Sequence, residues 1–136
     1  MPADTIIALE DIPVMYVMGE KGRPIGEQAP KAFQELESKL PSLQGRKFYG
    51  VVFAGCEYRA CVALAESDDP TSLPFPTWVI PGGKYARRKI ENWEEHIDSI
   101  GPTFDSLRRE NKFDPDRPDI EFYRSQRELL VMVPVK

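Results

Sequence analysis

The stretch Pro118–Lys136, PDIEFYRSQRELLVMVPVK, constrains the rest of the sequence most strongly, because it contains two extended segments joined by a short polar link. Its second segment, Leu129–Val135, is apolar throughout and is typical of a buried strand. Its first segment, residues 119–124, alternates, so that Glu121 and Tyr123 share one face and the apolar side chains share the other. We therefore expect a closing β-hairpin that presents a carboxylate beside a phenol.

The N-terminal half of the chain reads as one strand, one helix and one hairpin. Residues 12–18 are mostly apolar and indicate a strand. Apolar residues recur at helical spacing over residues 27–40, where Pro30 fits only in the first turn. Residues 48–53 and 58–64, joined by a short link, indicate a β-hairpin.

The C-terminal half repeats this order after a polar, proline-containing linker at about residues 67–76. Residues 77–90 are expected to be extended around a Pro-Gly-Gly break. Asn92 is suited to cap a helix whose apolar stripe begins at Trp93, in a pattern that resembles a capping box. Pro102 lies inside that stripe and predicts a kink or break just before it.

The repeated order predicts a single α+β domain, residues 1–136, built from pseudo-repeats at about 12–66 and 77–135. Each repeat has one helix and three strands, which is too little to bury both faces of a sheet. Pairing the two halves buries more surface and leaves a cleft along a pseudo-twofold axis. Interfaces of this kind are common ligand sites.

Composition and charge exclude several classes of protein. The chain of 136 residues has a net charge of −4 and no basic stripe, so nucleic acid is not expected as a direct partner. The longest apolar run is seven residues, far short of a membrane span. The N-terminus shows no secretion signal, and we expect a cytoplasmic protein. Cys56 and Cys61 are expected to point to opposite faces and to remain free thiols in a reducing compartment.

Motifs for metal, cofactor or triad chemistry are also missing from the sequence. The chain has one histidine, His96, on a polar helix face where we expect it to be solvated, and it has no Cys-x-x-Cys pair. It has no Gly-x-Ser-x-Gly segment and no phosphate-binding glycine loop. We therefore expect neither a metal nor a cofactor.

Three segments in this order resemble the GyrI-like small-molecule-binding domain, which is also the effector-binding half of multidrug-responsive bacterial regulators. The first is IPGGKYA at residues 80–86, and the second is the helical stripe from Trp93 through Phe104 to Leu107. The third is IEFY at residues 120–123, followed by VPV at the chain's end. Together they cover nearly the whole chain, from about Ile12 to Val135.

The resemblance implies an antiparallel sheet contributed by both halves, helices packed on one side, and a ligand cleft between the halves. Members of the family bind hydrophobic, often cationic or planar compounds, with an acid of the last hairpin in the pocket, and that position matches Glu121. Some stand-alone members resemble hydrolases of cyclopropane-bearing genotoxins, and one namesake inhibits gyrase. Nothing before Ile12 could form a helix-turn-helix, so we do not expect a transcription factor from this chain alone.

The candidate ligand-binding residues are the acid and the larger aromatics. For Glu121 the alternatives are a solvated acid on an open sheet and a pocket acid, which would also be the catalytic group of a hydrolase together with Tyr123. For the other aromatics the alternative to a pocket wall is core or surface packing. The full set of candidates is Glu121, Tyr123, Trp93, Trp78, Tyr85, Tyr16 and Tyr58.

Three functions follow from these expectations. The first is a protein that binds hydrophobic or cationic small molecules, with Glu121 as the polar anchor. The second is a hydrolase that opens strained rings with the same glutamate. The third is a protein-interaction module of the gyrase-inhibitor kind, for which the sequence itself offers no support.

Overall fold

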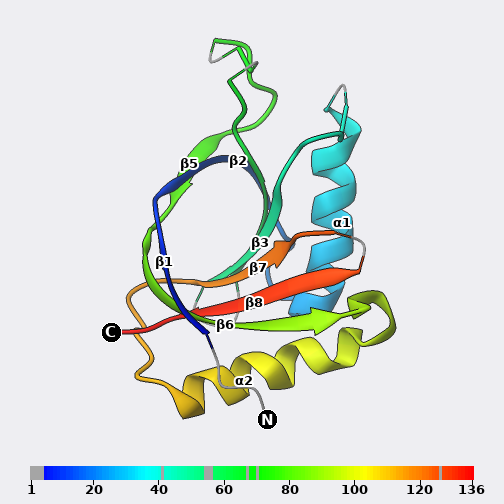
Figure 1. Ribbon diagram of the computed structural model, residues 1–136. Helices are drawn as coiled ribbons and strands as arrows, with labels where there is room; N and C mark the ends of the chain where they lie inside the picture. The colour runs from blue at the N-terminus through cyan, green and yellow to red at the C-terminus, as the bar shows by residue number, and fades with distance from the viewer. Residues whose placement is uncertain (1–4, 41, 54–56, 67, 70, 126) are drawn as a thin grey trace.

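The computed structural model describes residues 5–40, 42–53, 57–66, 68–69, 71–125 and 127–136. Within these residues, eight antiparallel strands form one sheet in the order β1-β6-β8-β7-β3-β4-β2-β5. The sheet curls into a half-barrel, and both helices lie on its outer side (Figure 1). The strands are β1 (Thr5–Leu9), β2 (Ile12–Met18), β3 (Phe48–Phe53), β4 (Glu57–Ala63), β5 (Thr77–Ile80), β6 (Gly83–Glu91), β7 (Asp119–Tyr123) and β8 (Glu128–Pro134).

The two helices each cover one half of the sheet. Helix α1 (Ile25–Ser38) packs against β2 and β4, and helix α2 (Ile100–Glu110) packs against β6 and β8. Two single-turn 3-10 helices, η1 (Trp93–Glu95) and η2 (Ile97–Ser99), lead into α2. None of the helices in the described ranges is both long and apolar enough to cross a membrane.

The α+β class and both predicted hairpins are confirmed. Strands β3 and β4 pair with Phe53 opposite Glu57, and the link between them lies outside the described residues together with Cys56. Strands β7 and β8 form the closing hairpin, with Tyr123 opposite Leu129. The central contact of the sheet is the pairing of β7 with β3, which joins the two hairpins.

Three local predictions are wrong, and one of them is the place of Pro30, which is the sixth residue of α1 and lies beyond its first turn. Strand β1 was not expected, because the sequence before Ile12 is short and its partner β6 lies far along the chain. The second helix does not begin at Asn92, whose φ of 52° is left-handed and whose side chain makes no capping hydrogen bond. The chain instead turns through η1 and η2, and α2 begins at Ile100. Pro102 therefore lies in the first turn, where a missing N–H costs little, and the predicted break before it is present.

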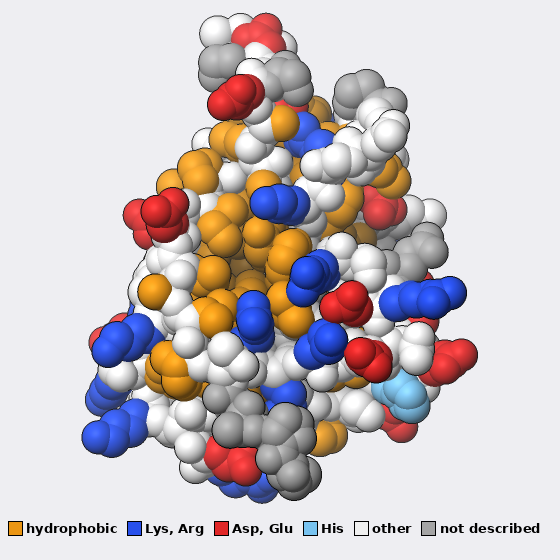
Figure 2. Space-filling model, in the orientation of Figure 1, with side chains coloured by type: hydrophobic (Ala, Val, Ile, Leu, Met, Phe, Trp, Pro, Cys, Tyr) orange, Lys and Arg blue, Asp and Glu red, His pale blue; other side chains and the backbone are white. Residues whose placement is uncertain are grey.

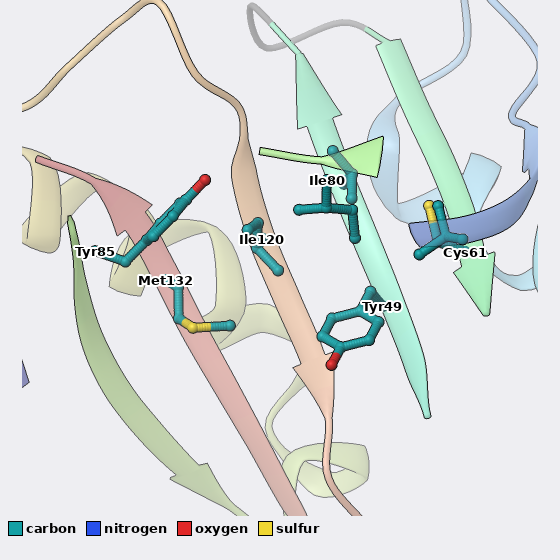
Figure 3. Packing of buried hydrophobic residues seen from close by; sticks show 8 residues of the cluster. Tyr49, Cys61, Ile80, Tyr85, Ile120 and Met132 are labelled. Atoms are coloured by element: carbon teal, nitrogen blue, oxygen red, sulfur yellow. The ribbon is translucent and has the colours of Figure 1, made fainter. Parts of the chain in front are cut away.

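The sheet has two differently packed faces. We call the face under the helices the helix face and the opposite one the concave face. Apolar side chains gather in the middle of the concave face (Figure 2), and a close view shows how they converge from several strands (Figure 3). The buried members of this concave cluster are Val14, Tyr49, Val51, Cys61, Ile80, Tyr85, Ile120 and Met132.

Two segments far apart in the sequence are tied together where the β1–β2 link meets the β5–β6 link. The backbone N–H of Gly82 donates to Oδ1 of Asp11 at 2.7 Å. A Cβ on Gly82 would lie 2.5 Å from the carbonyl oxygen of Leu9, so only glycine allows this approach. The strands that flank these links pair beside the contact, β1 with β6 and β5 with β2.

Candidate functional site

A hollow of about 1030 Å³ lies on the helix face, between α1 and α2 and over strands β3 and β7. A smaller hollow of about 480 Å³ runs along α1 beside Gly19, and the acids that line it are all exposed. The larger hollow is therefore the candidate site. Its apolar walls are formed by Ile25, Ala29, Phe33, Phe48, Val52, Trp93, Ile97, Ile100 and Phe104.

Glu121 lies at the floor of this hollow with 5% of its surface exposed. The hydroxyls of Tyr58 and Tyr123 both donate to its Oε1, each at 2.8 Å. Within the described part of the chain, no hydrogen bond reaches its Oε2. One carboxylate oxygen is thus held by two phenols, and the other remains able to accept from a molecule in the hollow.

Gly50 makes this arrangement possible. It lies opposite Glu121 in the β3–β7 pairing and opposite Ala60 in the β3–β4 pairing. A Cβ at Gly50 would collide with the Tyr58 hydroxyl and with Oε1 of Glu121. A glycine inside a strand marks a place where another group approaches the backbone closely, and here that group is the bonded phenol–carboxylate pair.

Burial sets the protonation of the three bonded groups. Removal from water raises the pKa of Glu121, the two phenol hydrogen bonds oppose that rise, and the nearby Asp119 adds to it. Burial also raises the pKa of Tyr58 and of Tyr123, so both hydroxyls stay protonated and remain donors. The site therefore holds a carboxyl group that accepts two hydrogen bonds but forms no ion pair with any of the described residues.

Aromatic rings surround the carboxylate on the helix face. The Phe33 ring meets the Tyr123 ring edge to face at 5.2 Å, and the Trp93 ring meets it at 5.1 Å. Phe33 also contacts the ring of Tyr58, at 6.2 Å. The indole N–H of Trp93 donates to the backbone oxygen of Ser125 at 3.1 Å, which fixes the ring's orientation. These rings present π faces or edges to the same space as the acid.

The charged side chains that line the hollow are mostly acids. Five carboxylates and three guanidinium groups line it among the described residues. Arg46 is already bound to Asp68 at 2.9 Å, and Arg108 contacts both Asp105 and Asp119. The carboxylates are Glu37, Glu94, Asp105, Asp119 and Glu121, and the remaining guanidinium belongs to Arg124.

Four of the seven predicted site residues come together here. Glu121, Tyr123 and Trp93 line the hollow, and Tyr58 reaches it through its bond to Glu121. Glu121 and Tyr123 lie on one face of β7, as the alternation along the strand predicts.

The other three candidates lie on the concave face, so the expectation that they share a cleft with Glu121 is not met. Tyr85 is fully buried in the concave cluster, where its hydroxyl donates to the backbone oxygen of Pro81 at 2.7 Å. Tyr16 and Trp78 pack against the same cluster and contact each other edge to face at 6.5 Å. The sheet itself separates them from the hollow, because side chains at these strand positions point to the opposite face.

The rings around Tyr16 already contact a cation of the protein itself, the guanidinium of Arg59. The guanidinium of Arg59 lies 4.6 Å from the centroid of Tyr16 and 4.7 Å from that of Trp78. It also lies 4.8 Å from the centroid of Phe53. These aromatic residues therefore form an internal cation–π cluster on the concave face.

Sequence reasoning missed three residues of the site. Phe33 was assigned only to the helical stripe, although a stripe residue at the edge of the packed face can form a pocket wall. Asp119 was taken as the start of a strand, yet it shares the face of Glu121 by the same alternation. Gly50 carried a usable signal, since a glycine inside an otherwise β-branched and aromatic strand indicates close approach.

Among the described residues, no three histidine, cysteine, aspartate or glutamate side chains gather in a way that could hold an ion. The chemistry available is that of a buried carboxyl group, two protonated phenols and aromatic surfaces.

Comparisons with known proteins give structural matches alone. No family profile matches the sequence, and no curated protein is significantly similar to it. An integron cassette protein from the mobile metagenome of Vibrio cholerae has a TM-score of 0.70 at 14% identity, covering 98% of this chain and 95% of that chain. The protein SAV2435, solved bound to tetraphenylphosphonium, has a TM-score of 0.66 at 10% identity over 99% and 94%.

A hydrolase from Listeria innocua is also similar, with a TM-score of 0.60 at 14% identity, covering 98% of this chain and 91% of that chain. At such low identities these matches show that the fold is shared over nearly the full length of each chain.

Proposed function

We propose that this protein binds hydrophobic cations in the hollow between α1 and α2, with Glu121 as the polar anchor. The observation that carries the proposal is the buried carboxyl group of Glu121, which has two phenol donors on one oxygen and no cationic partner among the described residues. The protein SAV2435, which shares the fold, was solved bound to tetraphenylphosphonium. That observation concerns SAV2435 and supports the proposal for this chain.

The energetics favour a large apolar cation over a small hydrated one. A charge enclosed by aromatic rings gains about 2 kcal/mol or more per favourable ring when it is desolvated. The walls of the hollow supply such rings in Phe33, Trp93 and Tyr123. A small inorganic ion would lose its hydration shell and find too few ligands to replace it. Attraction that rests on charge and rings imposes little demand on ligand shape.

We further propose that the hollow lies between two related units, residues 12–66 and 77–135. The strand pairings support this organisation. Strands β3 and β7 pair at the centre, β2 pairs with β4 as β6 pairs with β8, and β1 pairs with β6 as β5 pairs with β2.

Cys61 is free and buried, and burial raises the pKa of its thiol to about 12, which suits a reducing cytoplasm.

The proposal predicts that Glu121→Gln weakens binding of tetraphenylphosphonium by roughly 30-fold or more, because one partner of a desolvated charge pair is lost. Isothermal titration calorimetry measures the affinities directly. Glu66→Gln is the matched control, since Glu66 is exposed and lies outside the hollow. If wild type and Glu121→Gln bind tetraphenylphosphonium equally, Glu121 is not the anchor. If wild type binds none of a broad panel of apolar cations, the proposed function is wrong.

A second candidate function, hydrolysis of a strained electrophilic ring, uses the same residue. Glu121 has its pKa raised by burial, so it can act as a general base or acid closer to neutrality than an ordinary glutamate. The Tyr123 hydroxyl lies 2.8 Å from its Oε1 and could position the substrate. Turnover of a cyclopropane-bearing alkylator by wild type, lost in Glu121→Gln, would establish this function. Binding without turnover would exclude it for that compound. The gyrase-inhibitor interpretation rests on the family resemblance alone.

A further inference from the structure

The hollow contains a second buried carboxylate, Asp119, that none of the roles above uses. Its exposed fraction is 6%, and it lines the hollow two residues before Glu121 in β7. Its Oδ2 accepts a hydrogen bond from Arg108 Nη2, whereas its Oδ1 is buried and has no hydrogen-bond partner in the described residues. A buried acceptor without a partner is uncommon and costly in a folded protein.

Arg108 balances the charge of Asp119 but leaves its Oδ1 without a hydrogen bond. The Arg108 side chain is held by Asp105, at 2.8 Å, and lies near the rings of Phe104 and Phe113, each centroid 5.7 Å away. These contacts fix the guanidinium on one oxygen of Asp119. The other oxygen has no partner but is covered by its neighbours, so an N–H donor bound in the hollow reaches it once those neighbours shift.

We propose that Asp119 is a second anchor in the hollow, and that the preferred ligand is an elongated aromatic with a cationic, N–H-bearing group at each end. One group meets Oε2 of Glu121 and the other meets Oδ1 of Asp119. This inference rests on the proposed function, because it assigns the ligand class of the same hollow. A cation without N–H groups, such as tetraphenylphosphonium, uses Glu121 alone.

The strand fixes the spacing that the ligand must match. Residues two apart on one face of a strand are separated by about 7 Å. Two amidinium groups placed para on one benzene ring span a comparable length, so benzene-1,4-dicarboxamidine is a suitable probe. Benzamidine is its counterpart with one group, and tetraphenylphosphonium is the probe without donors.

The test measures the affinity of all three probes by calorimetry for wild type and variants. Wild type is expected to bind the diamidine about 10- to 100-fold more tightly than benzamidine, as one added hydrogen bond to a charged group allows. Asp119→Asn is expected to abolish that preference. Asp116→Asn, an exposed site outside the hollow, is expected to leave all affinities within about twofold of wild type.

A charge-balanced variant separates the anchor from a general electrostatic effect. Asp119→Asn alone removes one negative charge beside Arg108 and therefore weakens the binding of every cation. The double variant Asp119→Asn, Arg108→Gln restores the net charge, so tetraphenylphosphonium binding should recover while the diamidine preference stays lost. The double variant also serves if the single variant fails to fold, as judged by circular dichroism.

The outcomes distinguish this inference from the function on which it rests. An equal affinity of wild type for diamidine and benzamidine, or a preference that survives in the folded double variant, overturns the role of Asp119. If tetraphenylphosphonium still binds and Glu121→Gln still weakens it, the proposed function stands. If none of the three probes binds wild type, both fail together.

Discussion

Two opposing effects set the pKa of Glu121. Burial raises its pKa, whereas hydrogen bonds from Tyr58 and Tyr123 lower it. The phenols reach the carboxylate because Gly50 leaves room for them beside it. Such a residue is poorly stabilised as an anion in the empty protein and gains from any cation that enters. Ligand affinity and instability of the empty state therefore have the same origin.

This balance predicts how stability varies with pH. The folded pKa of Glu121 lies above its ordinary value of 4.5, so the stability gained from protonation is complete below pH 4.5 and is lost as pH rises through the folded pKa. Glutamine mimics the protonated acid at every pH. Without ligand, Glu121→Gln should therefore melt at a higher temperature than wild type near neutral pH, and the difference should shrink on acidification.

Thermal melts between about pH 4 and pH 8 measure this effect, with Glu66→Gln as the control. A variant that is less stable than wild type near neutrality would contradict the stated cause of the shift. The same ionisation makes cation affinity fall as pH is lowered through the raised pKa, because the protonated acid no longer attracts the ligand.

At the residue scale, the sequence predicted Glu121 and Tyr123 correctly as neighbours on one face, since alternation in a strand is a local property. It could not tell Trp93 from Trp78, because the face on which a ring lies depends on which strands are neighbours. It also could not show that Arg59 fills the rings around Tyr16.

Helix α1 differs from the prediction at its N-terminal end. It begins at Ile25, earlier than predicted, so Pro30 is its sixth residue and lies beyond the first turn. The expectation that Pro30 lies in the first turn is therefore wrong. Proline has no N–H to donate to the Gly26 carbonyl, and both residues line the hollow. The wall of the hollow thus has a weakened hydrogen-bond ladder.

Replacing Pro30 with alanine should raise the free energy of unfolding by roughly 1–3 kcal/mol, because the helical hydrogen bond can then form at an exposed position. Urea titration measures the change. Lys31→Ala, at the neighbouring exposed position, should change stability by less than about 0.5 kcal/mol. Destabilisation by Pro30→Ala would show that the proline's fixed φ favours α1 more than its missing bond weakens it.

At the element scale, the strands and hairpins were predictable because each carries its own apolar pattern. The start of α2 was not, since the stripe from Trp93 to Leu107 continues through η1 and η2 at nearly helical spacing. The helix is interrupted at His96, between η1 and η2, because its φ of −131° and ψ of 34° lie outside the helical region, and the stripe does not reveal this.

The sheet is completed at each edge by a strand that pairs with a distant part of the chain. Strand β1 extends the sheet beyond β6, and β5 extends it beyond β2. These pairings bring the β1–β2 and β5–β6 links into contact at Gly82. Because β3 and β7 pair at the centre, the same arrangement places α1 and α2 on either side of the hollow.

Gly82→Ala should therefore destabilise the fold by about 1–3 kcal/mol, because its Cβ would lie 2.5 Å from a backbone oxygen that cannot move cheaply. Gly101→Ala in α2 is the matched control. No described atom lies within 4 Å of its added Cβ, and alanine there should be neutral or stabilising. Equal effects of the two substitutions in urea titrations would mean that the contact between links is not a constraint.

At this largest scale, the order of most strands and helices was readable from the sequence, but the pairing of the edge strands was not. The pairing of β1 with β6 joins residues about 80 positions apart, such as Ile6 with Ala86, and no local pattern encodes it. The walls of the hollow depend on that topology, so they could not be expected from the order of the elements.

The most direct test of the central claim is the position of tetraphenylphosphonium in a crystal structure of its complex with this protein. We expect the cation in the hollow, between the rings of Phe33 and Trp93 and above Oε2 of Glu121. A cation bound on the concave face beside Tyr16 and Trp78, or an empty hollow at saturating ligand, would contradict it.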